Sequence, residues 1–265
     1  MKRILSLASL LAACCLPGGA SAANDPTTTT PATADAAASA DASVAAVVVS
    51  SSKDPDWKTY RAFTAGLDVF DAQRQLAPQA VLRFVLLPKR ANASLDGVKL
   101  RIAGDELSIP IPVEDDGTFK VPRSEAASKE DAELLLNRKP GTFRWRPDVR
   151  TPGTPANSRR LGDLRLECAV RWAIEQHETP YLIRKLIGAA GQPCIAARIK
   201  NDFIAPGTIV AMYLSSGDRR VQLPADMVEN GGTEFVAPVQ DTSWPDDALL
   251  EFDYAPLTRV AKWGR

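Results

Sequence analysis

The sequence predicts a mainly β protein. We expect one or two antiparallel β-sandwich-like modules with a short helix near residues 180–188, preceded by a signal peptide and a disordered linker. Twenty prolines among 265 residues disfavour a helical bundle, because proline interrupts helices. Short apolar or alternating segments bounded by turn residues recur along the chain, which is typical of β-sandwiches. The first 54 residues differ in composition from the rest.

Residues 1–22 have the pattern of a bacterial secretory signal. Two basic residues precede an apolar run over residues 4–16, and small residues at 20–22 form a cleavage site. The run is shorter than the ~20 residues that a membrane span needs. We therefore expect the folded part of the chain to be periplasmic or secreted.

The same segment supports a second interpretation, a lipoprotein signal. Leu11-Ala12-Ala13-Cys14 fits the small-residue pattern that precedes a lipidated cysteine, so Cys14 would become the anchored N-terminus. We favour plain cleavage, because the site at 20–22 follows a helix-breaking Pro-Gly-Gly. A contact with the membrane is expected only through this alternative anchor at Cys14.

Residues 23–54 are predicted to form a disordered linker. They are nearly all Ala, Thr, Ser, Asp, Pro and Val, and none is aromatic. Such a segment cannot bury enough apolar surface to offset the entropy of ordering. Its one apolar patch, Val44–Val49, has the β-branched content to add a strand to the sheet of a partner in an envelope complex.

The remaining residues are long enough for one large domain or two small ones. We expect two β-rich modules, 55–175 and 176–265, with one continuous domain over 55–265 as the alternative. A helix is expected to begin after Asp56, which is suited to capping it. Apolar or alternating patterns predict a first group of strands over 81–87, 98–102, 107–113, 118–121 and 141–149.

Turn residues define how some of these strands are placed. Pro110 and Pro112 cannot donate to a neighbouring strand, so the strand that contains them is expected at a sheet edge. Asp115-Asp116-Gly117 predicts a hairpin turn. Residues 130–136 are expected to form a short helix or a turn.

The segment from Leu164 to Ile174 fits two structures. Apolar residues occupy every second position, which favours a strand, but five apolar residues also share one face of a helix. We expect the strand. Thr179-Pro180 then predicts the start of a short helix over 181–187.

Cys168 and Cys194 are the cysteines that remain after the signal. An even number of cysteines in an oxidising compartment predicts a disulfide, with two buried thiols as the alternative. One histidine, His177, and no Cys-x-x-Cys pair give no basis for a metal site. We expect neither a metal nor a cofactor.

Two stretches, 97–122 and 207–238, repeat the same order of turn and strand signals. Gly, Asp and Pro recur in turns for local reasons, so the similarity has two explanations, duplication and shared turn chemistry. Duplication would mean that residues 55–265, the body of the protein, consist of two related β-modules.

Charge excludes one class of partner and suggests another. Without residues 1–22, which include two of the 32 basic residues, the net charge is −2, so nucleic acid is not an expected partner. Residues 105–133 carry a net charge of −6 and residues 138–171 one of +6. The candidate binding face for an anion or a partner, within the basic stretch, is Arg144, Trp145, Arg146 and Arg150.

Alternation along a strand would put Arg144 and Arg146 on one face and Trp145 on the other. The opposing interpretation is that the basic and acidic stretches form ordinary surface ion pairs, which contribute little each. The near cancellation of the two charges favours this second interpretation, because little steering field would remain.

No catalytic motif is evident. His177 lacks a Gly-x-Ser-x-Gly partner, and the sequence contains no phosphate-binding loop. The acidic pairs at 105–106, 115–116 and 246–247 are typical of turns. We therefore expect a non-enzymatic binding or accessory module for an envelope component or an anionic ligand. The alternative is a carboxylate-dependent hydrolase that acts on envelope polymers.

Overall fold

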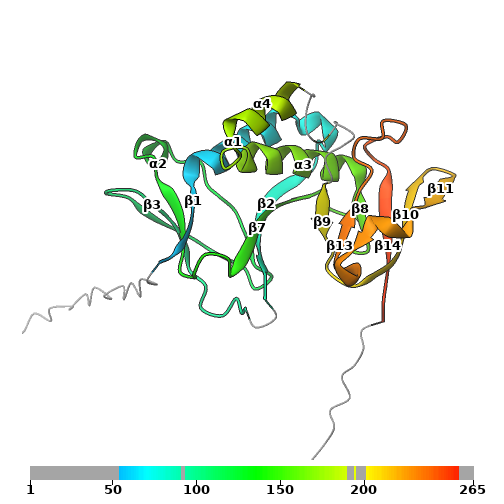
Figure 1. Ribbon diagram of the computed structural model, residues 1–265, viewed down its shortest axis with the longest axis horizontal. Coiled ribbons are helices and arrows are strands. Elements are labelled where there is room, and N and C mark those ends of the chain that lie inside the picture. Colours follow the sequence, from blue (N-terminus) through cyan, green and yellow to red (C-terminus); the bar gives the residue numbers. More distant parts are fainter. Residues whose placement is uncertain (1–53, 91–92, 190–193, 195–200, 257–265) are drawn as a thin grey trace, which may run out of the picture. The chain divides into compact units, whose positions relative to one another are not determined.

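The computed structural model describes residues 54–90, 93–189, 194 and 201–256. The predicted signal at 1–22, Cys14, the linker up to residue 53 and Val44–Val49 lie outside the described residues. Within the described part, every strand pairing is antiparallel and strands outnumber α-helices (Figure 1). The prediction of mainly antiparallel β structure is therefore confirmed, and the sandwich arrangement stays a prediction.

Two sheets come from the first part of the body. The first sheet has the order β1-β6-β3-β4, with bounds Asp56–Thr59, Glu133–Leu136, Leu100–Ala103 and Ser108–Ile111. The second, which we call the floor sheet, has the order β5-β2-β7, with bounds Thr118–Phe119, Val81–Pro88 and Phe143–Arg150.

Two further sheets lie mainly in the last part of the body. One has the order β11-β10-β14-β8, with bounds Arg219–Gln222, Ile209–Ser216, Leu249–Tyr254 and Ser158–Arg160. The other has the order β12-β13-β9, with bounds Val228–Glu229, Glu234–Val236 and Asp202–Ile204.

The described helices are α1, α2, α3 and α4, with bounds Tyr60–Ala72, Glu125–Lys129, Leu161–Glu175 and Tyr181–Ala189. Short 3₁₀ turns occur at Arg74–Leu76, Ala225–Met227 and Asn230–Gly232. The helices predicted after Asp56 and over 181–187 are confirmed as α1 and α4. Asp56 itself does not cap α1, because it lies in β1 and the helix begins after Thr59.

The strand predicted over 164–174 is wrong, and the helical alternative is correct. Leu166 and Val170 of α3 belong to a first hydrophobic core, whereas Leu161, Leu164 and Cys168 belong to a second. A helix that is buried on two sides carries apolar residues around much of its circumference. The resulting pattern has no single apolar stripe and happens to match a period of two.

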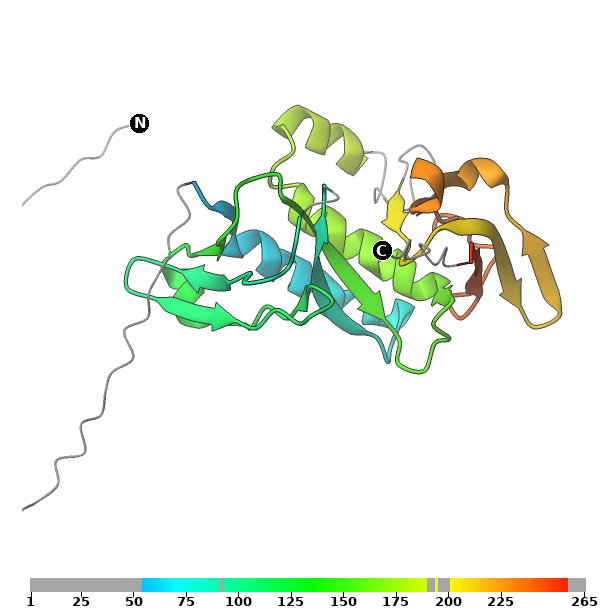
Figure 2. The ribbon, with the colours of Figure 1, turned by 90° about the horizontal axis from the view of Figure 1, so that it is seen from below.

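Helices α1 and α3 lie side by side in both views (Figure 1 and Figure 2). Gly66 lies in the middle of α1, and a Cβ at this position would come within 2.9 Å of Ile174 Cγ1. The glycine weakens the helix by its intrinsic propensity, but it permits this close approach. It is therefore a packing residue.

The other strand predictions have one error. The strands predicted over 81–87, 98–102, 107–113, 118–121 and 141–149 are confirmed as β2, β3, β4, β5 and β7. β4 lies at a sheet edge, as expected from Pro110. Residues 133–136 form β6, not a helix or turn, because Leu134 and Leu136 alternate into the first core between β1 and β3.

The predicted disulfide and hairpin turn are both present. Cys168 Sγ and Cys194 Sγ are 2.02 Å apart. The turn at 115–117 has Gly117 at a φ of +79°, and its N–H donates to the carbonyl of Glu114 at 2.8 Å. A Cβ on Gly117 would lie 2.7 Å from the carbonyl oxygen of Leu86, so both conformation and space favour glycine here. This turn places Asp116 beside the floor sheet.

Candidate functional site

A cleft of about 500 Å³ lies over the outer face of the floor sheet. Its floor comes from β2 and β7, its sides from residues 151–156 and from α3, and its opposite wall from β9 and the residues that follow it. Charged residues that line it are Arg83, Asp116, Arg146, Asp148, Arg150, Arg159, Glu167, Arg171 and Asp202. Five of these nine are arginines, and we call the site the arginine cleft.

Strand alternation builds the floor of the arginine cleft. Phe143 and Val149 of β7 are buried in the first core, and Trp145 packs against it. The residues between them therefore face the other side. Arg146 and Asp148 lie directly opposite Val85 and Arg83 of the antiparallel strand β2. All four residues line the arginine cleft.

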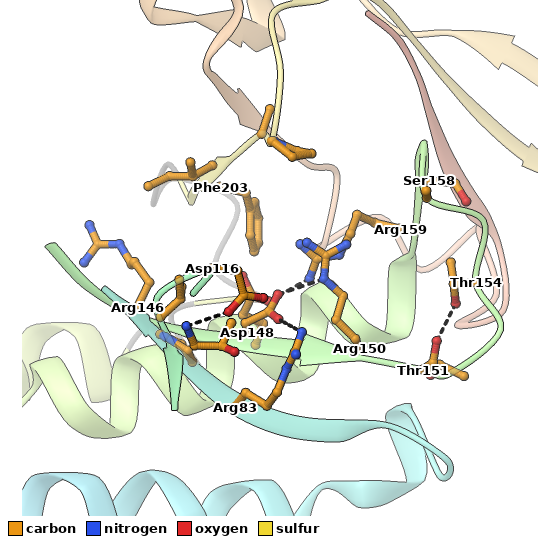
Figure 3. Close-up of a pocket in the computed structure, with 18 of the residues that line it drawn as sticks. Arg83, Asp116, Arg146, Asp148, Arg150, Thr151, Thr154, Ser158, Arg159 and Phe203 are labelled. Atoms are coloured by element: carbon orange, nitrogen blue, oxygen red, sulfur yellow. Dashed lines mark hydrogen bonds and ion pairs between the residues drawn. The ribbon is translucent and has the colours of Figure 1, made fainter. Parts of the chain in front are cut away.

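Asp148 lies between two arginines at the centre of this floor (Figure 3). Arg83 Nη2 donates to its Oδ2 at 3.0 Å, and Arg150 Nε donates to its Oδ1 at 2.7 Å. Burial alone would raise the pKa of Asp148, but the charge of Arg150 and the further arginines outweigh it and hold the pKa below its usual value. One ionised carboxylate thus serves two guanidinium groups, and Asp116 adds a second carboxylate to the lining of the cleft.

Arg146 and Arg171 share a second carboxylate. Arg146 Nη1 and Arg171 Nε donate to Glu175 Oε1 at 2.9 and 3.0 Å. Arg171 Nη1 also donates to the carbonyl oxygen of Asp202 in β9 at 2.8 Å. Burial lowers the pKa of the Arg146 guanidinium, and the charge of Arg171 lowers it further. The Nε of Arg146 is buried and has no hydrogen-bond partner within the described part of the chain.

Arg159 forms the deep end of the arginine cleft. Its Nη2 donates to Glu167 Oε2 at 2.6 Å and to the carbonyl of Val149 at 3.1 Å. Burial would lower the pKa of Arg159, but the charge of Glu167 and other carboxylates raises it overall. Its Nε, like that of Arg146, is buried without a partner among the described residues.

The structure brings together only part of the predicted binding face. Arg146 and Arg150 line the arginine cleft. Arg144 shares their strand face, but its Nη1 forms an ion pair with Glu234 at 2.7 Å, and it lines a neighbouring hollow. The Trp145 ring lies 5.9 Å from the rings of Phe63 and Phe119, and its Nε1 donates to Asp56 Oδ2 at 3.0 Å. Trp145 thus lies at the edge of the first hydrophobic core.

Each of the three predicted arginines has a carboxylate partner, but these partners, Glu234, Glu175 and Asp148, do not belong to the acidic stretch 105–133 that the ion-pair interpretation named. Sequence reasoning missed Arg83, Asp148, Arg159 and Arg171 as members of one site. One signal was available, because Arg83 interrupts an otherwise apolar strand. His177 is exposed in the turn after α3 and lies outside the arginine cleft.

The chain matches no protein-family model, no curated protein and no solved structure. The site must therefore be interpreted from its own chemistry. Among the described residues, no group of three or more His, Cys, Asp or Glu side chains is arranged to hold a metal ion. The arginines offer N–H donors in planar forks, which suit the oxygens of a carboxylate or a phosphate.

Proposed function

We propose that the protein is an exported, non-enzymatic binding module whose arginine cleft takes a small organic anion. One observation carries this proposal: Arg83 and Arg150 share the single carboxylate of Asp148 on the floor of the cleft. Both arginine side chains are 37% exposed. Each uses one N–H group on Asp148 within the described part of the chain, whereas a guanidinium carries five.

The lining supports an anion with an organic body. The apolar residues Val85, Leu87, Ile204 and Pro206 line the cleft around its charged floor. A cleft of this size falls within the range of small-molecule sites, in which apolar walls enclose a few polar groups that fix the orientation of the ligand.

Calorimetric titration of the protein with inorganic phosphate, citrate and glucuronate tests the proposal. We expect saturable binding of at least one of these anions, with the ligand unchanged after recovery. R83Q and R150Q should each weaken it about tenfold, the scale of one charge-assisted contact. The control is R61Q, because Arg61 is exposed and pairs with Asp131 away from the cleft. Equal affinities of R83Q, R150Q and R61Q would contradict the proposal.

The pKa directions of Asp116 and Asp148 give little support to a hydrolase that would use this pair. A hydrogen bond from Thr118 lowers the pKa of Asp116, and the neighbouring arginines lower that of Asp148. A hydrolase that uses two carboxylates needs one of them protonated as the general acid. Release of sugars or peptides from envelope polymers, abolished by D116N, would nevertheless favour it over binding.

The compartment is part of the same proposal. The intact mass of the protein from its native envelope fraction distinguishes the two N-termini. A chain that begins at Ala23 indicates a soluble secreted module, and an acylated chain that begins at Cys14 indicates a lipoprotein. A chain that retains residues 1–22 would contradict export. The two β-rich modules and their sandwich arrangement belong to this proposal as well.

A further inference from the structure

Helix α4 exposes an apolar face. Leu182, Ile183 and Leu186 are 74%, 49% and 67% exposed, and none of the nine residues of α4 is buried. Four of the eight large apolar side chains that are exposed in the described residues belong to this helix, including Tyr181. The three aliphatic residues, with Ile187, lie on one side of the helix, and Arg184 and Lys185 lie on the other.

The chain holds this helix at both ends. The turn after α3 precedes it, and Cys194, which follows it, is bonded to Cys168 in α3. In both views α4 lies at the outside of the described structure (Figure 1 and Figure 2). A helix that contributes no residue to either core receives little stabilisation from tertiary packing. The disulfide therefore constrains an element whose apolar face is directed at solvent.

Charge indicates what covers this face. Helix α4 itself, residues 181–189, contains two basic residues and no acidic one. Lys185 Nζ and Arg184 Cζ lie 5.1 and 5.7 Å from the centre of the Tyr181 ring. With about 3.6 residues per turn, Arg184 and Lys185 fall just beyond the two edges of the apolar face, next to Ile187 and Leu182. Pairing of two such helices in a dimer would bring like charges together, which is unfavourable. An anionic surface complements both features.

We propose that α4 docks on the surface of an anionic lipid bilayer, with Leu182, Ile183 and Leu186 in the acyl boundary and the two basic side chains at the headgroups. An amphipathic helix with basic residues beside its apolar face binds in this way. No described helix is long and apolar enough to cross a membrane, so this contact is peripheral. It is independent of the arginine cleft, and it adds a membrane contact to the anchor considered at Cys14.

Vesicle binding tests the proposal. The full chain is sedimented with vesicles of phosphatidylcholine alone and with vesicles containing about one quarter phosphatidylglycerol. We expect binding to the anionic vesicles to exceed that to the neutral ones several-fold, because each basic residue near the surface adds attraction. Hydrogen exchange of the amides of residues 181–189 should slow when anionic vesicles are added, which reports on α4 itself and not on the N-terminus.

The deciding comparison uses two double variants. L182S/L186S should lower the partition coefficient at least about tenfold, because two buried leucines are lost from the contact. V210S/V221S is the matched control, since these valines are 67% and 44% exposed on β10 and β11. Thermal unfolding of all three proteins verifies that each is folded.

Three results would overturn the proposal. One is equal partitioning of the two double variants. Another is unchanged exchange at residues 181–189 in the presence of vesicles. The third is self-association in solution, seen by sedimentation velocity and lost in L182S/L186S, without vesicle binding.

Discussion

Arg159 Nη2 donates to Glu167 Oε2 at 2.6 Å, and the two side chains are only 5% and 11% exposed. This buried ion pair joins β8 to α3 at the deep end of the arginine cleft. Glu167 Oε2 also accepts the backbone N–H of Val149 at 3.0 Å, so the pair holds β7 in place as well. Burial raises the pKa of Glu167, and the charge of Arg159 opposes that rise.

Removal of one partner from this pair should destabilise the fold strongly. In Glu167→Gln the Arg159 charge stays buried without its closest counter-ion. We expect a loss of about 3 kcal/mol in the free energy of unfolding, measured by urea denaturation, because an uncompensated buried charge is costly. The control is D131N, which breaks the exposed pair of Arg61 and Asp131 and should cost less than about 1 kcal/mol.

The double variant R159M/E167Q separates charge from packing. Methionine removes the buried charge, and glutamine keeps an oxygen that can accept from Val149. We expect this double variant to be more stable than E167Q alone, because buried ion pairs contribute little beyond their mutual compensation. An E167Q protein as stable as wild type, or a double variant no more stable than E167Q, would contradict this account.

The sequence predicts the strands well where one side faces the core. β2 and β7 follow their apolar patterns, and Pro110 correctly indicates an edge. The pattern fails for α3, because Leu166 and Leu164 of the same helix enter different cores. β6 was missed for a related reason: its four residues pair on both sides, and so short a segment has little periodicity to detect.

The candidate site is predictable only in part. Alternation on β7 correctly separates Arg146 from Trp145. Arg83, Arg159 and Arg171 come from three other elements, and only the folded chain brings them to Asp148 and Glu175. Local sequence spacing cannot predict which arginines share the site, because the site forms only where β2, β8 and α3 pack beside β7.

Loss of the disulfide should destabilise the protein. The bond closes a loop between residues 26 apart in the sequence, for which chain entropy predicts about 3 kcal/mol. We expect C168S/C194S to lower the free energy of unfolding by about 3 kcal/mol. In a chain that begins at Ala23, which lacks Cys14 and Cys15, intact mass with alkylation should give two labels only after reduction. Two labels without reduction, or an unchanged stability of the double variant, would contradict the assignment.

Neutralisation of Asp148 should strengthen anion binding. The carboxylate competes with any anion for Arg83 and Arg150, so Asp148→Asn removes the negative charge to which both guanidinium groups are hydrogen-bonded. We expect the affinity for the anion that binds wild type to rise about tenfold at low salt, and the gain to shrink as salt screens the charges. Titration calorimetry measures both the affinity and its dependence on salt.

D246N is a suitable control, since Asp246 pairs with Arg165 outside the arginine cleft. Weaker binding by D148N than by wild type would show that Asp148 itself contacts the ligand or shapes the site.

The same residue should contribute to acid unfolding. The arginines hold the pKa of Asp148 below its usual value against the effect of burial. A carboxyl with a depressed pKa in the folded state stabilises the fold above its unfolded pKa of about 3.9. That contribution is lost as pH falls through the lower, folded value, with a slope of up to about 1.4 kcal/mol per pH unit. The stability difference between wild type and D148N should therefore be constant above about pH 5 and shrink below pH ~4. Urea unfolding over this range measures it. For D131N, which changes a carboxylate that is 72% exposed, the difference should stay small throughout, and a D148N difference that is flat down to the acid transition would contradict the role of Asp148.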